Sequence, residues 1–228
     1  MAIQNPLEDV AARLGLHRAS RMPRLQTPAR PTGFPSLDRA LGGGLPENGL
    51  VEVAAPHGGL SSFLHRLAAT HTRKGEHVAW IDPGHCLDVA GLEAAGVELG
   101  RLLWLPVRQH GRLPAMVDLL LASGLTPLVL LDLAHAPGDT RPAPPGAWVR
   151  LARRAEHHGT LLVCGTRQPV AGAAAATLLV LDPPRPCWHG AGETPTTLEG
   201  AGLGIRVLRR RHGPGPVTSG LEHLEAGA

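Results

Sequence analysis

Aromatic side chains are almost absent from this sequence: they make up 3% of its 228 residues, and there is no Tyr at all. The hydrophobic core must therefore be built from Leu, Val, Ala and Ile. Bases of single-stranded nucleic acid bind proteins largely by stacking on aromatic rings. The scarcity of such rings excludes a strong single-strand binder of the stacking type.

Cysteine is also scarce, with three residues at Cys86, Cys164 and Cys187 and no paired spacing. This excludes a disulfide framework and favours a reducing compartment. No second pair of His or Cys ligands stands at zinc spacing, so we expect no metal site. There is no apolar run of membrane-spanning length, and the acidic, helix-patterned start is not a signal peptide. The sequence predicts a cytoplasmic protein without a membrane partner.

Positive charge is carried by arginine, because Lys74 is the only lysine, and the formal net charge is +3. The arginines gather near the two ends of the chain, at positions 13, 18, 21, 24 and 30 and at positions 206 and 209–211. A mildly basic balance is weak evidence for a nucleic-acid partner. A biased base composition of the coding sequence, together with arginines on solvated faces, explains the positive charge equally well.

The first 31 residues form a unit of their own. Residues 6–16 place Leu7, Val10 and Leu14 on one face of a short amphipathic helix. Prolines then make an extended, arginine-bearing arm. A helix this short is not stable alone in water, so we expect the three apolar side chains to bind the core or a partner. A core domain is expected over residues 32–212 and a flexible tail over residues 213–228.

The core shows the alternation typical of an α/β fold. Apolar runs predict strands, amphipathic segments predict helices, and Ser36 is the expected N-cap of the first core helix. Near-continuous apolar strands indicate a mostly parallel sheet flanked by helices, and two late strands without helices indicate an antiparallel extension at one edge. The expected strands are residues 50–55, 77–82, 102–107, 127–133, 160–166, 176–184 and 203–211. The expected helices are a short one that follows Ser36 and ends at glycines 42–44, and residues 61–75, 87–97, 113–124 and 147–159.

Such sheets bind ligands at the carboxyl ends of their strands, which here are the loops after Val53, Asp82, Asp132 and Thr166. The first of these loops is rich in glycine and precedes a helix, as in a phosphate-binding loop. Its residues are Pro56, Gly58, Gly59, Ser61 and Ser62, with Asp132 as the candidate magnesium-holding acid. Ser61 stands where a lysine is needed, and a neutral hydroxyl cannot replace that charge in phosphoryl transfer. We therefore expect no cofactor and no catalytic residue. Weak anion binding and a purely structural turn both remain open.

Four segments resemble RecA-type recombinases: TGFPSLDRALGGGLPENGLVEVAAPHGGLSSF (residues 32–63), HVAWIDPGHCLD, PLVLLDL and GTLLVCGTRQP. The resemblance covers residues 32–214 and implies a RecA-like core. Several positions depart from the family pattern. Ala55 and Leu60 replace glycines of the loop, and Ser61 replaces its lysine. Gly84 stands where the family has its catalytic glutamate. Thr166 and Arg167 occupy the place of the nucleotide-sensing Asn-Gln pair.

A short RecA-like chain with such departures is similar to the ImuA family, which is also grouped with SulA-like proteins. This resemblance implies a non-enzymatic accessory protein of damage-induced mutagenic translesion synthesis, active in the SOS response. The implied partners are RecA, the polymerase-like protein ImuB and DNA, with modulation of RecA filaments. Two alternatives stay open: an active ATPase of the KaiC or RadA kind with an atypical loop, and a cell-division inhibitor.

Direct DNA binding is a further expectation. It would be independent of sequence and would fall steeply with salt. The alternative interpretation of the last arginines is that they solvate an edge strand and prevent aggregation. The candidate phosphate contacts are Arg141, Arg150, Arg167, Arg206, Arg209, Arg210 and Arg211.

Overall fold

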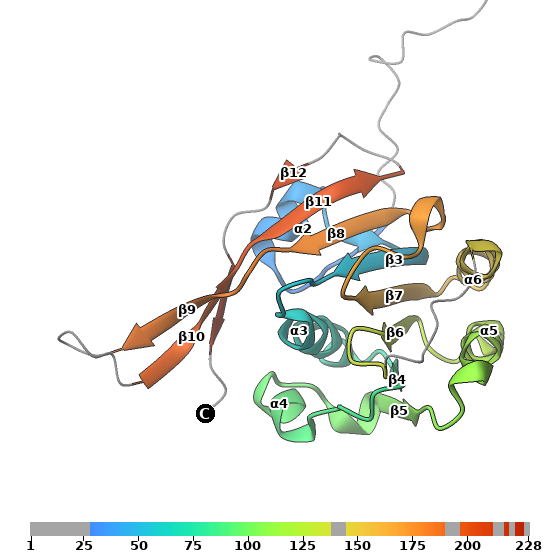
Figure 1. The fold of residues 1–228 in the computed structure, drawn as a ribbon, viewed down its shortest axis with the longest axis horizontal. Coiled ribbons are helices and arrows are strands. Elements are labelled where there is room, and N and C mark those ends of the chain that lie inside the picture. Colours follow the sequence, from blue (N-terminus) through green and yellow to red (C-terminus); the bar gives the residue numbers. More distant parts are fainter. Residues whose placement is uncertain (1–27, 138–144, 190–196, 212–216, 219–221, 226–228) are drawn as a thin grey trace, which may run out of the picture.

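A mixed eight-stranded sheet forms the centre of the computed structural model, which describes residues 28–137, 145–189, 197–211, 217–218 and 222–225 (Figure 1). The strand order is β12-β11-β8-β3-β7-β6-β4-β5. From β8 to β5 all pairs are parallel, and β11 and β12 extend the sheet antiparallel. The predicted fold class is confirmed. The predicted N-terminal helix, with Leu7, Val10 and Leu14, lies outside the described residues.

The elements of the large sheet alternate along the chain. Its strands are β3 (Gly49–Ala54), β4 (Val78–Asp82), β5 (Leu102–Pro106), β6 (Leu128–Asp132), β7 (Leu161–Thr166), β8 (Thr177–Leu181), β11 (Ile205–Arg210) and β12 (Val217–Thr218). The helices are α2 (Pro35–Leu41), α3 (Leu60–Thr72), α4 (Val89–Ala94), α5 (Leu113–Ser123) and α6 (Pro145–His157). Single 3-10 turns are η2 (Leu99–Arg101), η3 (His110–Arg112) and η4 (Gly172–Ala174).

Helices cover both faces of this sheet, which explains why the central strands are mostly apolar. The helices α2, α3 and α4 pack on one face, and α5, α6 and η4 pack on the other. All residues of β3, β4, β6, β7 and β8 are buried. In Figure 1, α3 and α4 lie below and to the left of the sheet, while α5 and α6 lie at its right.

Two small sheets complete the fold, and neither was predicted. Strands β1 (Ala29–Arg30) and β2 (Leu45–Pro46) pair just before the large sheet begins. Strands β9 (Arg185–His189), β10 (Thr197–Leu203) and β13 (Glu222–Glu225) form an antiparallel sheet in the order β13-β10-β9. This second sheet projects from the core at the lower left of Figure 1. Part of the segment expected as a tail therefore pairs as β12 and β13.

The start of α2 differs from the prediction, because Ser36 is not its N-cap. Phe34 holds that position, with no hydrogen bond from a capping side chain. The carboxylate of Glu222, from β13, instead accepts hydrogen bonds from the amides of Ser36 (2.6 Å) and Leu37 (3.2 Å). The first amides of a helix lack partners within the helix, and here a distant carboxylate satisfies them. The helix ends as predicted at Gly42, which has a left-handed φ of 71°.

Candidate functional site

The glycine-rich loop lies, as predicted, between β3 and α3 at the carboxyl edge of the sheet. Gly58 and Gly59 have φ angles of 98° and 83°, which side-chain-bearing residues rarely adopt. A cavity of about 480 Å³ opens over this loop. It is lined by Ala55, Pro56, Gly58, Gly59, Leu60, Ser61, Ser62, Ala134, His135 and Arg167. The loops after β3, β6 and β7 thus meet here.

Leu60 anchors this loop by packing into the protein. Its side chain is buried, and it lies against Gly165 of β7 so closely that a Cβ added there would be 2.6 Å from Leu60 Cδ2. A phosphate loop with glycine at position 60 would leave that space open. The apolar contact between Leu60 and Gly165 therefore fixes the loop on the end of β7.

The carboxylate of Asp132 is used by the loop that follows its own strand. One oxygen accepts hydrogen bonds from the amides of Ala134 (3.1 Å) and His135 (3.3 Å). The other oxygen lies 2.7 Å from Nδ1 of His135. Asp132 is buried. Its hydrogen bonds stabilise the β6 loop, as expected for an aspartate that caps a turn.

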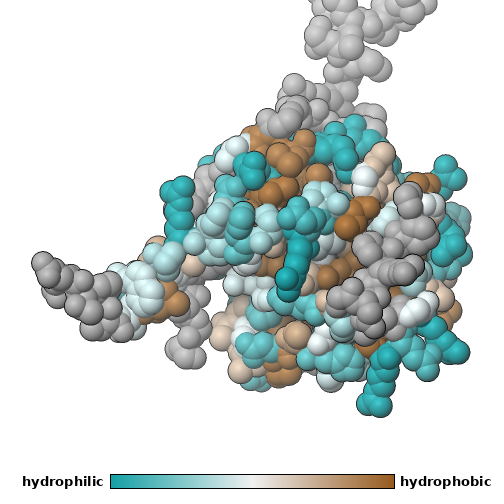
Figure 2. Space-filling model, viewed as in Figure 1, coloured by the Kyte–Doolittle hydropathy of each residue, from teal (hydrophilic) through white to brown (hydrophobic). Residues whose placement is uncertain are grey.

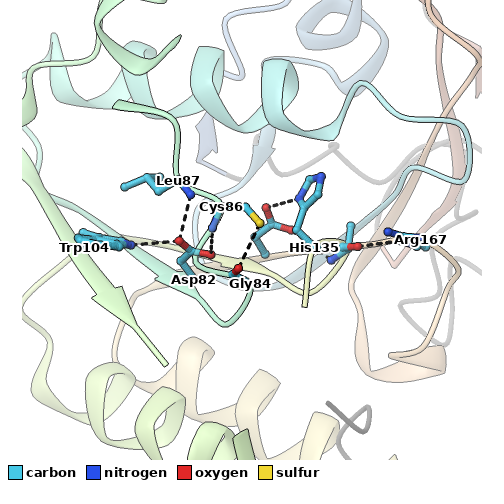
Figure 3. Close-up of polar contacts among 9 residues, drawn as sticks. Asp82, Gly84, Cys86, Leu87, Trp104, His135 and Arg167 are labelled. Carbon is cyan, nitrogen blue, oxygen red and sulfur yellow. Dashed lines mark hydrogen bonds and ion pairs between the residues drawn. The ribbon is translucent and has the colours of Figure 1, made fainter. Parts of the chain in front are cut away.

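Asp82 has the same kind of role after β4 (Figure 3). Its buried carboxylate accepts hydrogen bonds from the amides of Cys86 and Leu87, both at 3.1 Å, and from Nε1 of Trp104 at 3.2 Å. The loop between β4 and α4 is thereby fixed. Asp82 does not cap α4 itself, whose N-cap is Asp88.

Gly84 lies in this fixed loop, directly against the loop that follows β6. A Cβ added to Gly84 would be 2.2 Å from the carbonyl oxygen of His135 and 2.8 Å from its carbonyl carbon. Figure 3 shows Gly84 and His135 on neighbouring loops. Any side chain at position 84, including a carboxylate, would require one of the two backbones to move.

Arg167 supplies a positive charge to the cavity from the end of β7. Its Nε donates a hydrogen bond of 2.8 Å to the carbonyl oxygen of Ala134, and the residue is exposed. This contact joins the loops after β6 and β7 (Figure 3).

The buried hydroxyl of Thr166 has no partner among the described residues. Behind the loops, burial raises the pKa of the Cys164 thiol, and the carboxylates of Glu52 and Asp132 add to this rise.

The other arginines predicted to bind DNA do not form one surface. Arg206 pairs with Asp182 at 2.8 Å, and Arg211 pairs with Glu156 at 2.8 Å. Arg209 donates to the carbonyl oxygen of Gly172, and Arg210 donates to that of Leu41 at 2.6 Å. The last two partners belong to opposite faces of the sheet. Arg150 lies on α6, and Arg141 is outside the described residues.

The structure also shows a basic face on α6 that the sequence analysis did not single out. Arg153, Arg154 and His157 accompany Arg150 around a shallow hollow of about 380 Å³, together with Gly146 and Val149. The signal was available in the sequence, because positions 150, 153, 154 and 157 have the i, i+3, i+4, i+7 spacing of one helical face.

The residues that the structure describes contain no group of three or more His, Cys, Asp or Glu side chains placed to hold a metal ion. Among the same residues, no helix combines the length and the apolar character that crossing a membrane requires.

The sequence was compared with known proteins. No protein-family model matches it. It is 31% identical over 140 residues to RecA of Thermus thermophilus, which covers 59% of this chain and 41% of that protein. It is 30% identical over 140 residues to RecA of Bifidobacterium longum, covering 59% of this chain and 35% of that one. RecA of Salinispora arenicola is 34% identical over 122 residues, with 52% and 35% covered.

The chain thus spans about two fifths or less of the length of the curated relatives it matches. The likeness agrees with the parallel sheet and with a glycine-rich strand–loop–helix unit at its carboxyl edge. The sequence similarity to RecA proteins over about half of the chain and the mostly parallel sheet are together consistent with a RecA-like α/β core.

Proposed function

We propose that this chain is a non-catalytic RecA-like accessory protein of damage-induced mutagenic translesion synthesis. It acts by binding RecA, a polymerase-like partner of the ImuB kind, and DNA. One observation carries the proposal: the residues around the phosphate-loop cavity make contacts with the protein itself. Leu60 is buried under the loop, Asp132 caps the next turn, and Gly84 has no room for a side chain.

Phosphoryl transfer needs charge stabilisation and an oriented nucleophile, with little covalent chemistry left for the protein. The loop offers Ser61 where a lysine would contact the outer phosphates, and position 84 offers no carboxylate to orient a water molecule. Arg167 is the one cation that lines the cavity among the described residues. Its guanidinium is oriented by the carbonyl oxygen of Ala134. These features support an accessory role over an ATPase.

A protein-binding role is supported by the free edge of the large sheet. β5 is its last strand, with a neighbour only on the β4 side among the described residues. Leu103 and Trp104 on this strand are 45% and 48% exposed. An exposed edge with apolar side chains is a template for pairing with a strand of another chain. We propose that this edge contacts a RecA subunit together with the N-terminal arm.

The first experiment measures ATP turnover by the purified chain, with Asp132→Ala as the comparison. Both proteins are expected to show only background hydrolysis. Turnover by the parent chain that Asp132→Ala abolishes would contradict the proposal and favour the ATPase of the KaiC or RadA kind.

The second experiment is a pull-down of RecA with the full chain and with a chain that lacks residues 1–31. Binding by the full chain is expected, and its loss on truncation would assign the contact to the first 31 residues, which hold β1 as well as Leu7, Val10 and Leu14. Equal binding by both chains would remove the arm from the proposal. Absence of RecA binding by the full chain would contradict the RecA partnership itself.

DNA binding is tested by fluorescence anisotropy with single-stranded DNA at low and raised salt. We expect modest affinity that falls with salt, and a weaker complex for Arg167→Gln than for Arg206→Gln, because Asp182 already pairs with Arg206. Lack of binding at low salt would remove DNA from the set of partners.

A further inference from the structure

The outer face of α6 concentrates positive charge on a rigid element. Arg150, Arg153, Arg154 and His157 line the hollow described above, at helical spacing. Seven residues of α-helix span about 10 Å, so the basic groups form a short stripe along the helix axis. α6 lies beside α5 at the right of Figure 1, and Figure 2 shows hydrophilic side chains projecting at that margin.

Few carboxylates oppose this charge. Asp118 of α5 accepts hydrogen bonds from Nε and Nη2 of Arg154, both at 3.2 Å, and lies 3.9 Å from Nε of Arg150. The Arg150 side chain is 58% exposed. Arg153 is exposed, and it has no ion pair within the part of the chain that the structure describes. Glu156, on the same helix, pairs with Arg211. One aspartate thus pairs with two of the three guanidinium groups, and the third is left without a carboxylate partner among the described residues.

The hollow combines an existing carboxylate contact with an exposed apolar side chain and no aromatic ring, which fits an acidic peptide better than single-stranded nucleic acid. Arg154 donates two hydrogen bonds to the carboxylate of Asp118 on α5, which is a bidentate geometry that carboxylates accept well. Val149 is 41% exposed, and Gly146 has no side chain, so the same surface offers an apolar contact. No aromatic ring lines the hollow for base stacking, since Trp148 is buried.

We propose that the outer face of α6 binds an acidic amphipathic peptide segment of a partner protein. Carboxylates of the segment pair with Arg150 and Arg153, while an apolar side chain packs on Val149. Acidic residues three or four positions apart on a helix match the spacing of these arginines. The inference rests on the proposed function in requiring a protein partner, but it concerns a surface that shares no residue with the cavity, the β5 edge or the N-terminal arm.

The probe is a fluorescein-labelled 15-residue helical peptide with glutamates at i, i+4 and i+7 and leucines on an adjoining stripe. Its binding to the full chain is followed by anisotropy at moderate salt. Arg153→Glu should weaken binding by roughly three- to tenfold, because an exposed ion pair is replaced by a like-charge contact. The control is Arg108→Glu, which makes the same charge change at an exposed arginine beyond β5. It should bind like the parent chain.

A charge swap tests the register of the contact. A peptide with one glutamate replaced by lysine should recover affinity toward Arg153→Glu and lose it toward the parent chain. Circular dichroism melts confirm that both variants fold.

Three results would overturn the proposal: no binding, an equal loss with Arg108→Glu, or displacement of the peptide by oligo(dT) whose own binding depends on Arg153. The last result would make α6 a nucleic-acid site. None of the three changes the ATP or RecA results on which the proposed function depends.

Discussion

Replacing Gly84 with alanine tests whether the β4 and β6 loops are packed as tightly as the structure shows. The new Cβ would lie 2.2 Å from the carbonyl oxygen of His135, a backbone atom that no rotamer change can move away. His135 is itself held by Asp132 at 2.7 Å. Overpacking of this kind costs about 1–3 kcal/mol. For a domain of this size each kcal/mol lowers Tm by about 2–4 °C, so the expected loss is about 2–12 °C.

The assay is thermal unfolding followed by circular dichroism, with Gly100→Ala as the matched control. A Cβ at Gly100 meets no atom within 4 Å, and neither glycine has a positive φ, so the two variants differ in steric contact alone. Gly100→Ala should stay within about 0.5 kcal/mol of the parent chain. Gly84→Glu should melt at least as low as Gly84→Ala. If both Gly84 variants melt with the parent chain, the loops are not closed against each other.

Further predictions concern contacts around the core. Leu60→Ala should lower the free energy of unfolding by about 2–5 kcal/mol, because it leaves a cavity beside Gly165. Gly165→Ala should partly fill that cavity. In denaturant unfolding, the double variant should therefore lose less stability than the sum of the two single losses. Burial lowers the pKa of His71 from its ordinary value of 6.5, so the unfolded chain binds more protons than the folded chain near that pH. The free energy of unfolding should therefore fall as pH drops below about 6.5. The fall should be smaller in His71→Gln. A pH-independent midpoint of urea unfolding between pH 7.5 and 5.5 would refute this. Glu222→Ala should cost about 1–2 kcal/mol through the lost cap of α2, whereas Glu199→Ala, in an exposed pair, should cost little in the same thermal assay.

The central sheet could be predicted because its strands are encoded locally. Runs such as residues 128–131 and 161–165 are apolar throughout, which is typical of strands buried on both faces. The ends of α2 and α5 could be predicted equally well, since Gly42 and Gly124 adopt left-handed φ angles of 71° and 62°. By contrast, β9 is a short and mostly exposed segment with Pro186 inside it and Pro183 and Pro184 directly before it, and no periodicity marks it as a strand.

The position of the candidate site could be predicted from the sequence, but the contacts within it could not. Glycines and the aspartate after β6 located the cavity, because their signals are local. The packing of Leu60 against Gly165, and of Gly84 against His135, joins residues far apart in sequence. No pattern within one segment reports such a contact. The cap that Glu222 gives to α2 has the same origin, and for that reason Ser36 was the wrong prediction.

These long-range contacts explain why changing one residue is not expected to give the chain a nucleotide site. A lysine at position 61 would leave Asp132 unchanged, with both of its oxygens accepting hydrogen bonds from the β6 loop. A glutamate at position 84 would first displace that same loop. Because both obstacles meet in the backbone at His135, relieving one disturbs the other. A loop held this way suits a rigid body that presents fixed surfaces, such as the β5 edge and the α6 face, to other molecules.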